Sequence, residues 1–221
     1  MNAADRADTL ARYRERLLRH GFGPRALGWD KGNQEVRFTA VLRALGDDGF
    51  ASLLDVGCGL GDLFGQLHGL GWKGRYLGLD VVPEFLAEAR RRFGANGAEF
   101  RELALPAEEL AETFDVAVAI GIFNHRTRQD PWQHLEATLG ALWAHTRTAV
   151  AVDFLSGTAE ERRADLCYWE AGEVLRRGLR LSKRASLEHD YMPFEFLLRL
   201  WHDDSFSRDC PVFAQPPARP E

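Results

Sequence analysis

The chain has 221 residues, of which 45% are hydrophobic and 28% charged. This length fits one compact domain and excludes a large multidomain enzyme. No stretch approaches the ~20 apolar residues of a membrane span, and the charged N-terminal stretch is unlike an export signal, so we expect a cytoplasmic protein with no membrane partner. The 28 basic residues are outnumbered by 33 acidic ones, which argues against a nucleic-acid partner and favours a small molecule.

Residues 1–45 are predicted to form an N-terminal helical cap. Leu10, Tyr13 and Leu17 recur at helical spacing, and a second set of apolar residues does so between positions 36 and 45. The loop GFGPRALGWDKGN separates the two helices, because its glycines and proline interrupt regular structure. Asn33 ends this loop, where its side chain can cap the second helix.

Residues 46–210 are predicted to form the main α/β domain, because short apolar runs alternate with helical stretches around a parallel sheet. Strands are expected at 52–56, 75–79, 99–103, 116–120 and 148–154, and helices at 61–70, 83–93, 107–113 and 131–145. Residues 156–182 break this alternation and are predicted to be an accessory cap segment, with a helix near 170–177. Two more strands are expected at 184–189 and 194–201, and the proline-rich residues 211–221 predict a loose tail.

The sequence LLDVGCGLGD at 53–62 combines an apolar strand, an acidic residue and three glycines that open into an amphipathic helix. The glycines, Gly57, Gly59 and Gly61, follow one another at two-residue spacing. Glycines at a turn from strand to helix permit positive φ and let the backbone approach a ligand closely. The motif therefore predicts a ligand-binding turn, and an ordinary glycine-rich connection is the alternative.

Two acidic residues near this turn narrow the class of ligand. Asp80 ends the second predicted strand about 20 residues after the turn, where a carboxylate can accept hydrogen bonds from both hydroxyls of a ribose. A dinucleotide site would have GxGxxG spacing, with the helix N-terminus facing a pyrophosphate. Here the spacing is GxGxG. Asp55 precedes it, where it would repel a pyrophosphate but can orient a cationic amino-acid group, directly or through water.

The stretches DVGCGLGD and YLGLD resemble the cofactor-binding half of class I S-adenosylmethionine-dependent methyltransferases. The resemblance spans residues 50–155 and implies a Rossmann-like, seven-stranded, mostly parallel sheet with helices on both faces and an antiparallel last strand. It also implies the cofactor S-adenosyl-L-methionine. In that case Gly57, Gly59 and Gly61 would line its methionine part, Asp80 its ribose and Val81 its adenine edge.

One segment departs from the family pattern. Many members have an acidic residue just after the third strand that binds the adenine amino group, whereas this chain has ELALPAEEL, with Glu102 in the strand and Leu105 in the loop. Adenine recognition by a side chain is therefore not expected there. Three further stretches, GWDKGNQEVRF, GIFNHR and DYMPFEF, resemble a bacterial subgroup of these proteins, which supports the fold more than any particular substrate.

The end of the fourth predicted strand supplies candidate functional residues, because ligands of open parallel sheets bind at the carboxyl ends of the strands. The resemblance places Phe123 in contact with the cofactor. Asn124 is a catalytic candidate that can fix the amino-acid end of the cofactor or a substrate nucleophile. His125 is the histidine best placed to act as a general base, and a solvated loop histidine is the alternative.

Aromatic residues outside the central strands are candidates to cover the pocket. A sulfonium is a cation, and an aromatic face within about 6 Å stabilises a cation, so Trp29 is assigned to the cofactor. Tyr168 and Tyr191 are assigned to the catalytic site, with core packing as the alternative for each. No metal site is predicted, because the acidic residues lack a histidine at ligand spacing and the three cysteines show no CxxC pattern.

The leading hypothesis is methyl transfer from S-adenosylmethionine to a small-molecule acceptor. The first alternative keeps the cofactor but lets its own amino group attack its γ-carbon, as in azetidine-2-carboxylate synthases, with release of methylthioadenosine. The second alternative is a protein that binds the cofactor without turnover. The oligomeric state and the identity of the acceptor stay open at this point.

Overall fold

The computed structural model describes residues 1–29, 34–45 and 49–203, so Asn33 and the predicted tail at 211–221 lie outside the described residues. The helices are α1 (Ala3–His20), α2 (Pro24–Leu27), α3 (Gln34–Leu45), α4 (Asp62–Gly69), α5 (Pro83–Phe93), α6 (Pro131–Ala144) and α7 (Ala171–Gly178), with a 3-10 turn η1 (Gly94–Asn96). The strands are β1 (Ser52–Val56), β2 (Arg75–Asp80), β3 (Glu99–Glu102), β4 (Phe114–Ala119), β5 (Thr146–Leu155), β6 (Arg184–Met192) and β7 (Glu195–Trp201).

The strands form one seven-stranded sheet in the order β3-β2-β1-β4-β5-β7-β6. Neighbours from β3 to β5 are parallel, whereas β7 is antiparallel to both β5 and β6. The predicted Rossmann-like sheet with an antiparallel last strand is therefore confirmed. The strand order reverses between β1 and β4, and at such a switch point the carboxyl ends of the strands leave a crevice for a ligand.

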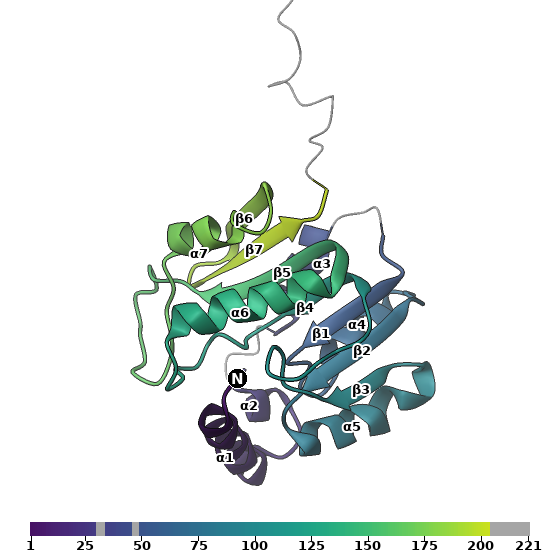
Figure 1. The fold of residues 1–221 in the computed structure, drawn as a ribbon. Coiled ribbons are helices and arrows are strands. Elements are labelled where there is room, and N and C mark those ends of the chain that lie inside the picture. The colour runs from purple at the N-terminus through teal and green to yellow at the C-terminus, as the bar shows by residue number, and fades with distance from the viewer. Residues whose placement is uncertain (30–33, 46–48, 204–221) are drawn as a thin grey trace, which may run out of the picture.

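Helices cover both faces of the sheet, as the continuous apolar runs of its central strands require. On one face, α3, α4 and α5 pack onto the strands through residues such as Val41, Phe64 and Leu86. On the other face, α6 and α7 do so through Leu139 and Val174, and Figure 1 shows α6 lying across the sheet. The two layers fix the strands, so the turns at their ends have a rigid base.

Helix α1 lies apart from both layers, over the turn that joins β2 to α5. Its residues Leu10, Tyr13 and Leu17 pack against a cluster that includes Val82 and Phe85. Figure 1 shows α1 and the short α2 side by side at the lower edge of the molecule. Because that turn follows the carboxyl end of β2, α1 covers the ligand edge of the sheet.

The helix predicted at 107–113 is wrong, because those residues form turns and irregular chain. Leu110 alone of this segment is buried, so no apolar stripe exists to dock a helix, and so short a helix is unstable by itself. Its acidic side chains make tertiary contacts instead. The Glu108 carboxylate accepts a hydrogen bond from the Ala104 N–H at 2.5 Å, and Glu112 pairs with Arg101 at 2.9 Å.

Strand β6 continues beyond its predicted end at residue 189. Its pairing with β7 resumes at Met192 after a register shift. Asp190 and Tyr191 therefore lie within the strand, whereas the sequence placed them after it. Asp190 accepts a hydrogen bond from Arg43 of α3 at 2.8 Å.

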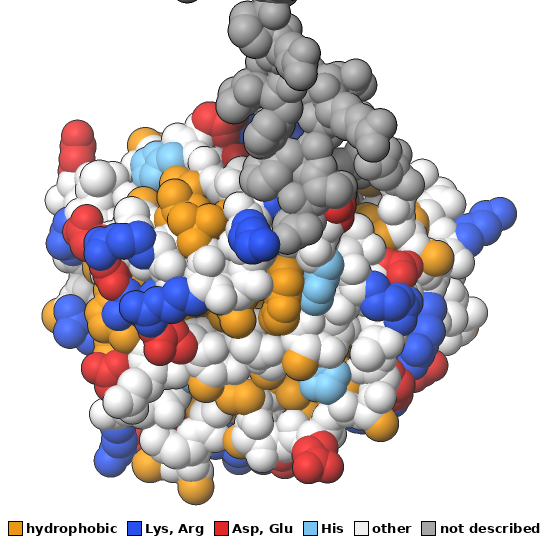
Figure 2. Space-filling view, turned by 45° about the horizontal axis from the view of Figure 1, so that its top comes forward, with side chains coloured by type: hydrophobic (Ala, Val, Ile, Leu, Met, Phe, Trp, Pro, Cys, Tyr) orange, Lys and Arg blue, Asp and Glu red, His pale blue; other side chains and the backbone are white. Residues whose placement is uncertain are grey.

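The surface carries charges of both signs. Figure 2 shows blue and red side chains interspersed on the viewed face, with smaller apolar areas between them. In residues 1–29, 34–45 and 49–203, no helix is long and apolar enough to cross a membrane.

Candidate active site

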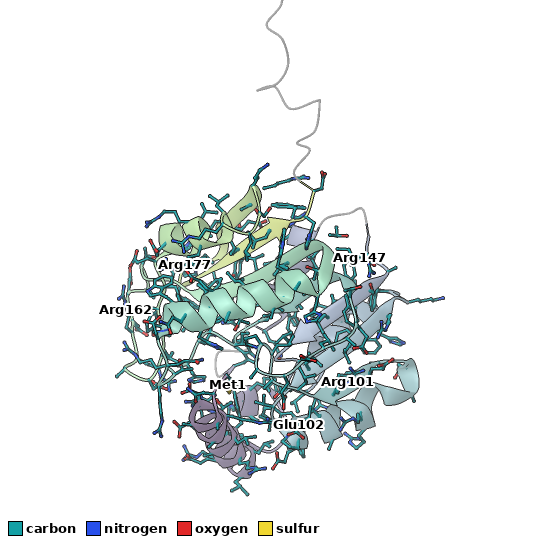
Figure 3. All side chains as sticks on the ribbon, in the orientation of Figure 1. Met1, Arg101, Glu102, Arg147, Arg162 and Arg177 are labelled. Carbon is teal, nitrogen blue, oxygen red and sulfur yellow. The ribbon has the colours of Figure 1, made fainter. Side chains whose placement is uncertain are left out.

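A cavity of about 820 Å³ lies where β1, β2 and β4 end. The turn after β1, the end of β2 and the turn after β4 contribute to its lining, and so do α1 and the chain after β5. Figure 3 labels two lining residues, Met1 beside α1 and Arg162 in the chain after β5. Its volume is in the range of small-molecule sites, and its position matches the switch point of the sheet.

The glycine turn has the backbone that its sequence predicts. Gly57 and Gly59 have φ angles of 80° and 55°, which other residues rarely adopt. A Cβ on Gly57 would overlap Cγ2 of Ile122. The N–H groups of Gly57 and Cys58 both donate to the Leu79 carbonyl, at 2.7 and 3.0 Å. The turn is therefore fixed to the end of β2, with its backbone against the cavity.

Asp80 braces the same turn with both carboxylate oxygens. Oδ2 accepts a hydrogen bond from the Gly59 N–H at 2.9 Å, and Oδ1 accepts one from the Val82 N–H at 2.9 Å. Burial raises the pKa of Asp80, and these amide hydrogen bonds oppose that rise. Each carboxylate oxygen has a further lone pair, so Asp80 can accept hydrogen bonds from a ligand while it holds the loop.

Asp55 is buried at the end of β1 and also lines the cavity. Its Oδ2 accepts a hydrogen bond from the Tyr76 hydroxyl at 2.6 Å. Burial raises the pKa of Asp55 to about 7, the Tyr76 hydrogen bond opposes the rise, and the charges of Asp80 and Asp62 add to it. A nearby cation favours the charged form of a carboxyl group, so this site is suited to a cationic ligand group.

The turn after β4 is held by the chain that follows β5. The Asn124 carbonyl accepts a hydrogen bond from the Cys167 N–H at 3.0 Å, and the Phe123 carbonyl accepts one from Trp169 Nε1 at 3.1 Å. Asn124 lines the cavity, and its buried Oδ1 has no hydrogen-bond partner in the described part of the chain. A buried polar atom of this kind calls for a partner, which a bound ligand can supply.

His125 lies next to Asn124 on the cavity wall, and its ring is 6.3 Å from that of Tyr13 in an edge arrangement. Its buried Nδ1 has no hydrogen-bond partner among the residues that the structure describes. Burial lowers the pKa of His125 to about 4, and the positive charges of Arg12 and Arg16 lower it further. The imidazole is therefore neutral near pH 7, with a free lone pair on one ring nitrogen, and its low pKa makes it a weaker base than a solvated histidine.

A buried charged cluster that the sequence did not predict supports the cavity. Nε and Nη2 of Arg37 donate to the two carboxylate oxygens of Glu195, and Asp153 Oδ2 lies 4.0 Å from Arg37 Nε. Asp153 Oδ1 accepts a hydrogen bond from the Gly121 N–H at 2.6 Å. The Arg37 guanidinium also covers the Trp29 ring, 4.1 Å from its centroid. The cluster joins α3, β5 and β7 behind the turn after β4.

Most of the predicted site residues line this one cavity. They are Trp29, Asp55, Gly57, Gly59, Asp80, Val81, Asn124, His125 and Tyr168. The Tyr168 hydroxyl accepts a hydrogen bond from the Arg163 N–H at 2.9 Å, which fixes the ring in the chain after β5. Sequence reasoning missed Arg37 and Glu195, which also line the cavity.

Three predicted site residues do not line the cavity. Gly61 is the N-cap of α4, and a Cβ there would lie 2.9 Å from ring atoms of Phe100, so helix packing requires this glycine. Phe123 is buried and stacks on Phe154 with ring centroids 5.3 Å apart. Tyr191 packs against the core cluster under α3, α4 and α5. These three therefore contribute to the core that supports the site.

The wall of the cavity fits a nucleoside with a cationic amino-acid part. A positive-φ backbone at Gly57, the carboxylates of Asp55 and Asp80, and the unpaired Oδ1 of Asn124 all border one space. For residues 1–29, 34–45 and 49–203, no group of three or more histidine, cysteine or acidic side chains is arranged to hold a metal ion.

The order of the strands and the glycine turn after β1 define the fold of class I methyltransferases. A family model described as "Methyltransferase domain" matches residues 53–144. The chain is also 36% identical over 156 residues to "Putative methyltransferase Rv1506c" of Mycobacterium tuberculosis (strain ATCC 25618 / H37Rv). The matched region covers 66% of this chain and 90% of that protein. The chain therefore belongs to the methyltransferase family.

Solved structures share this fold at low sequence identity. Magnesium protoporphyrin IX methyltransferase from Synechocystis PCC 6803, with bound SAM, has a TM-score of 0.66 at 15% identity and covers 92% of this chain and 100% of its own. The N-methyltransferase NodS from Bradyrhizobium japonicum WM9, in complex with S-adenosyl-L-homocysteine, has a TM-score of 0.64 at 16% identity and covers 86% of this chain and 98% of its own. The predicted S-adenosylmethionine cofactor agrees with these structures.

Proposed function

We propose that this methyltransferase binds S-adenosyl-L-methionine and methylates a small-molecule acceptor. The observation that carries the proposal is that one cavity joins the glycine turn and Asp80 to Asn124, His125 and Tyr168. The cofactor side and the acceptor side thus share one space at the switch point of the sheet. An acceptor that enters this space would meet the residues after β4 and the chain after β5.

The chain's own residues divide into two groups around the cofactor. The backbone of Gly57 and Gly59 takes the methionine part, Asp80 accepts hydrogen bonds from the ribose hydroxyls, and Val81 packs at the adenine edge. The carboxyl group of Asp55 faces the cationic amino group. Trp29 lies at the same end, where its ring is already in contact with the guanidinium of Arg37.

When bound, S-adenosylmethionine supplies an electrophilic methyl group on a positively charged sulfonium. Asn124 orients an amine acceptor by accepting, at Oδ1, a hydrogen bond from an N–H that the nitrogen keeps, and neutral His125 accepts the proton that a hydroxyl or ammonium nucleophile must lose. Tyr168 helps to exclude water. Alignment of this kind can supply about 7–11 kcal/mol of the barrier reduction, so a methyltransferase needs little further chemistry from its side chains.

The test is to identify the nucleoside that the protein releases from S-adenosylmethionine, by mass spectrometry, with and without a panel of small acceptors. Methyl transfer predicts S-adenosylhomocysteine that depends on the acceptor. Methylthioadenosine would instead indicate cyclisation of the cofactor, and cofactor retention without product would indicate a binding protein. With an active acceptor, Asn124→Ala should lower turnover at least tenfold and change cofactor affinity less, while Asn96→Ala, at η1, serves as the control.

A further inference from the structure

Helix α1 places its arginines in two different environments. On its solvent side, Arg14 pairs with Glu84 at 2.7 Å and Arg19 pairs with Glu15 at 2.8 Å. Arg12 and Arg16 are half-buried and line the cavity instead. Because they are four residues apart, they lie on the same side of the helix. In the described ranges, neither makes a salt bridge.

The Arg16 guanidinium has no anionic partner among the residues that the structure describes. Its Nη1 is buried and has no hydrogen-bond partner within residues 1–29, 34–45 and 49–203. It rests against the backbone of Gly28, where a Cβ would overlap it. An unpaired charge that is removed from water costs free energy, and a second guanidinium four residues away adds repulsion. A bound anion would relieve both costs.

The other arginines that face this space are already engaged. Arg163 pairs with Asp165 at 2.8 Å, and the guanidinium of Arg162 lies over the ring of Tyr168, 5.4 Å from its centroid. Burial is the main cause of the lowered pKa of His125, and the charges of Arg12 and Arg16 add to it, whereas that of Asp165 opposes it. Arg12 and Arg16, which make no salt bridge in the described ranges, thus lie on α1 near His125.

We propose that the acceptor carries a carboxylate or phosphate group, which Arg12 and Arg16 bind at the α1 side of the cavity, next to His125. The inference rests on the proposed methyl transfer and adds the substrate class to it. Guanidinium groups match the planar, bidentate geometry of these anions. An acceptor anchored in this way would extend past His125 and Asn124, so its nucleophilic atom could be placed beside them.

The experiment measures anion binding to the full chain saturated with S-adenosylhomocysteine, by calorimetry at low ionic strength, with inorganic phosphate and benzoate as separate probes. The test variant is Arg12→Met/Arg16→Met. The control is Arg14→Met/Arg19→Met, which removes the same charge from the other side of the same helix. S-adenosylmethionine affinity and circular dichroism are measured for both variants. The two probes distinguish a phosphate site from a carboxylate site.

We expect the test variant to lose at least tenfold in affinity for one probe or both, the control to change less than twofold, and both to bind S-adenosylmethionine within threefold of the parent. Equal losses in the two variants would overturn the proposal, because the effect would then be general charge. Absence of anion binding by the parent would also overturn it. A tenfold loss of cofactor affinity in the test variant would show that these arginines bind the cofactor's own carboxylate. Failure of the parent to bind S-adenosylmethionine would instead refute the proposed function.

Discussion

Replacement of Gly57 by alanine tests the geometry of the glycine turn after β1. Gly57 has a φ of 80°, a left-handed conformation that costs about 1–2 kcal/mol for a residue with a Cβ. The new methyl group would also overlap Cγ2 of Ile122, and overpacking of this kind typically costs about 1–3 kcal/mol. The free energy of unfolding should therefore fall by about 2–5 kcal/mol.

Gly97 provides a control that separates these two effects. It has a φ of 89° and nothing within 4 Å of an added Cβ. Gly97→Ala should therefore lose only the conformational part, about 1–2 kcal/mol. Ile122→Ala removes the overlapping methyl group and leaves Ile122 Cβ 3.7 Å from the new Cβ, an ordinary contact. The double variant with Gly57→Ala should therefore be less destabilised than the sum of the two single variants.

The assay is urea unfolding of the parent, the three single variants and the Gly57→Ala/Ile122→Ala double variant, without cofactor. The expected coupling between positions 57 and 122 is about 1–3 kcal/mol, well above the ~0.5 kcal/mol within which independent sites add. A Gly57→Ala cost no larger than that of Gly97→Ala would refute the reasoning, and so would additivity of the Gly57 and Ile122 effects. In either case the turn would not be packed as the structure shows.

Three further predictions concern charged side chains near the cavity. Asp80→Ala should weaken S-adenosylmethionine binding by about 1.5–3 kcal/mol and also lower the melting temperature, because Asp80 braces the turn at Gly59; unchanged affinity in calorimetry would limit Asp80 to the bracing role. Burial raises the pKa of Asp55 to about 7, so its contribution to stability is present at low pH and is lost as the pH rises through 7. The free energy of unfolding, measured with urea, should therefore fall more for the parent than for Asp55→Asn between about pH 5 and pH 8. An equal fall in the two proteins would contradict this. Arg37→Met should lower the free energy of unfolding by about 3–5 kcal/mol at pH 8. The loss should be smaller at pH 6, where Asp153 and Glu195 take up protons more readily because burial raises the pKa of both carboxyl groups. The exposed Arg43→Met control should lose at most about 1 kcal/mol.

The sheet could be predicted from the sequence because each strand carries its own signal. All five residues of β1 are buried, and because strands inside a parallel sheet are buried on both faces, most of their residues are apolar. The prediction of a helix at 107–113 was wrong because the structure of that segment depends on residues outside it. Its outcome depends on Arg101 and Ala104, which bind the side chains of Glu112 and Glu108, and these contacts leave no periodic pattern in the segment itself.

Part of the candidate site could also be predicted from the sequence, and part could not. The glycine turn and Asp80 belong to one motif with fixed spacing, so the sequence could predict that they meet. Arg37 and Glu195 are 158 residues apart, and their pairing follows from the order of the strands, which no local pattern contains. Phe123 is a residue whose neighbour lines the cavity while it does not itself. It follows β4 next to Asn124, yet its ring points into the core, because neighbouring residues of a turn face different directions.

The charged cluster gives a physical reason for three sequence stretches that lie far apart. GWDKGNQEVRF contains Trp29 and Arg37, and DYMPFEF contains Glu195, which pairs with Arg37. GIFNHR begins at Gly121, whose N–H donates to Asp153, and a Cβ on Gly121 would lie 2.7 Å from the Trp29 ring. Removal of one partner from such a buried cluster leaves an unpaired charge, which costs far more than the loss of a surface pair. The three stretches are therefore constrained together, and the constraint acts on the turn that carries Asn124 and His125.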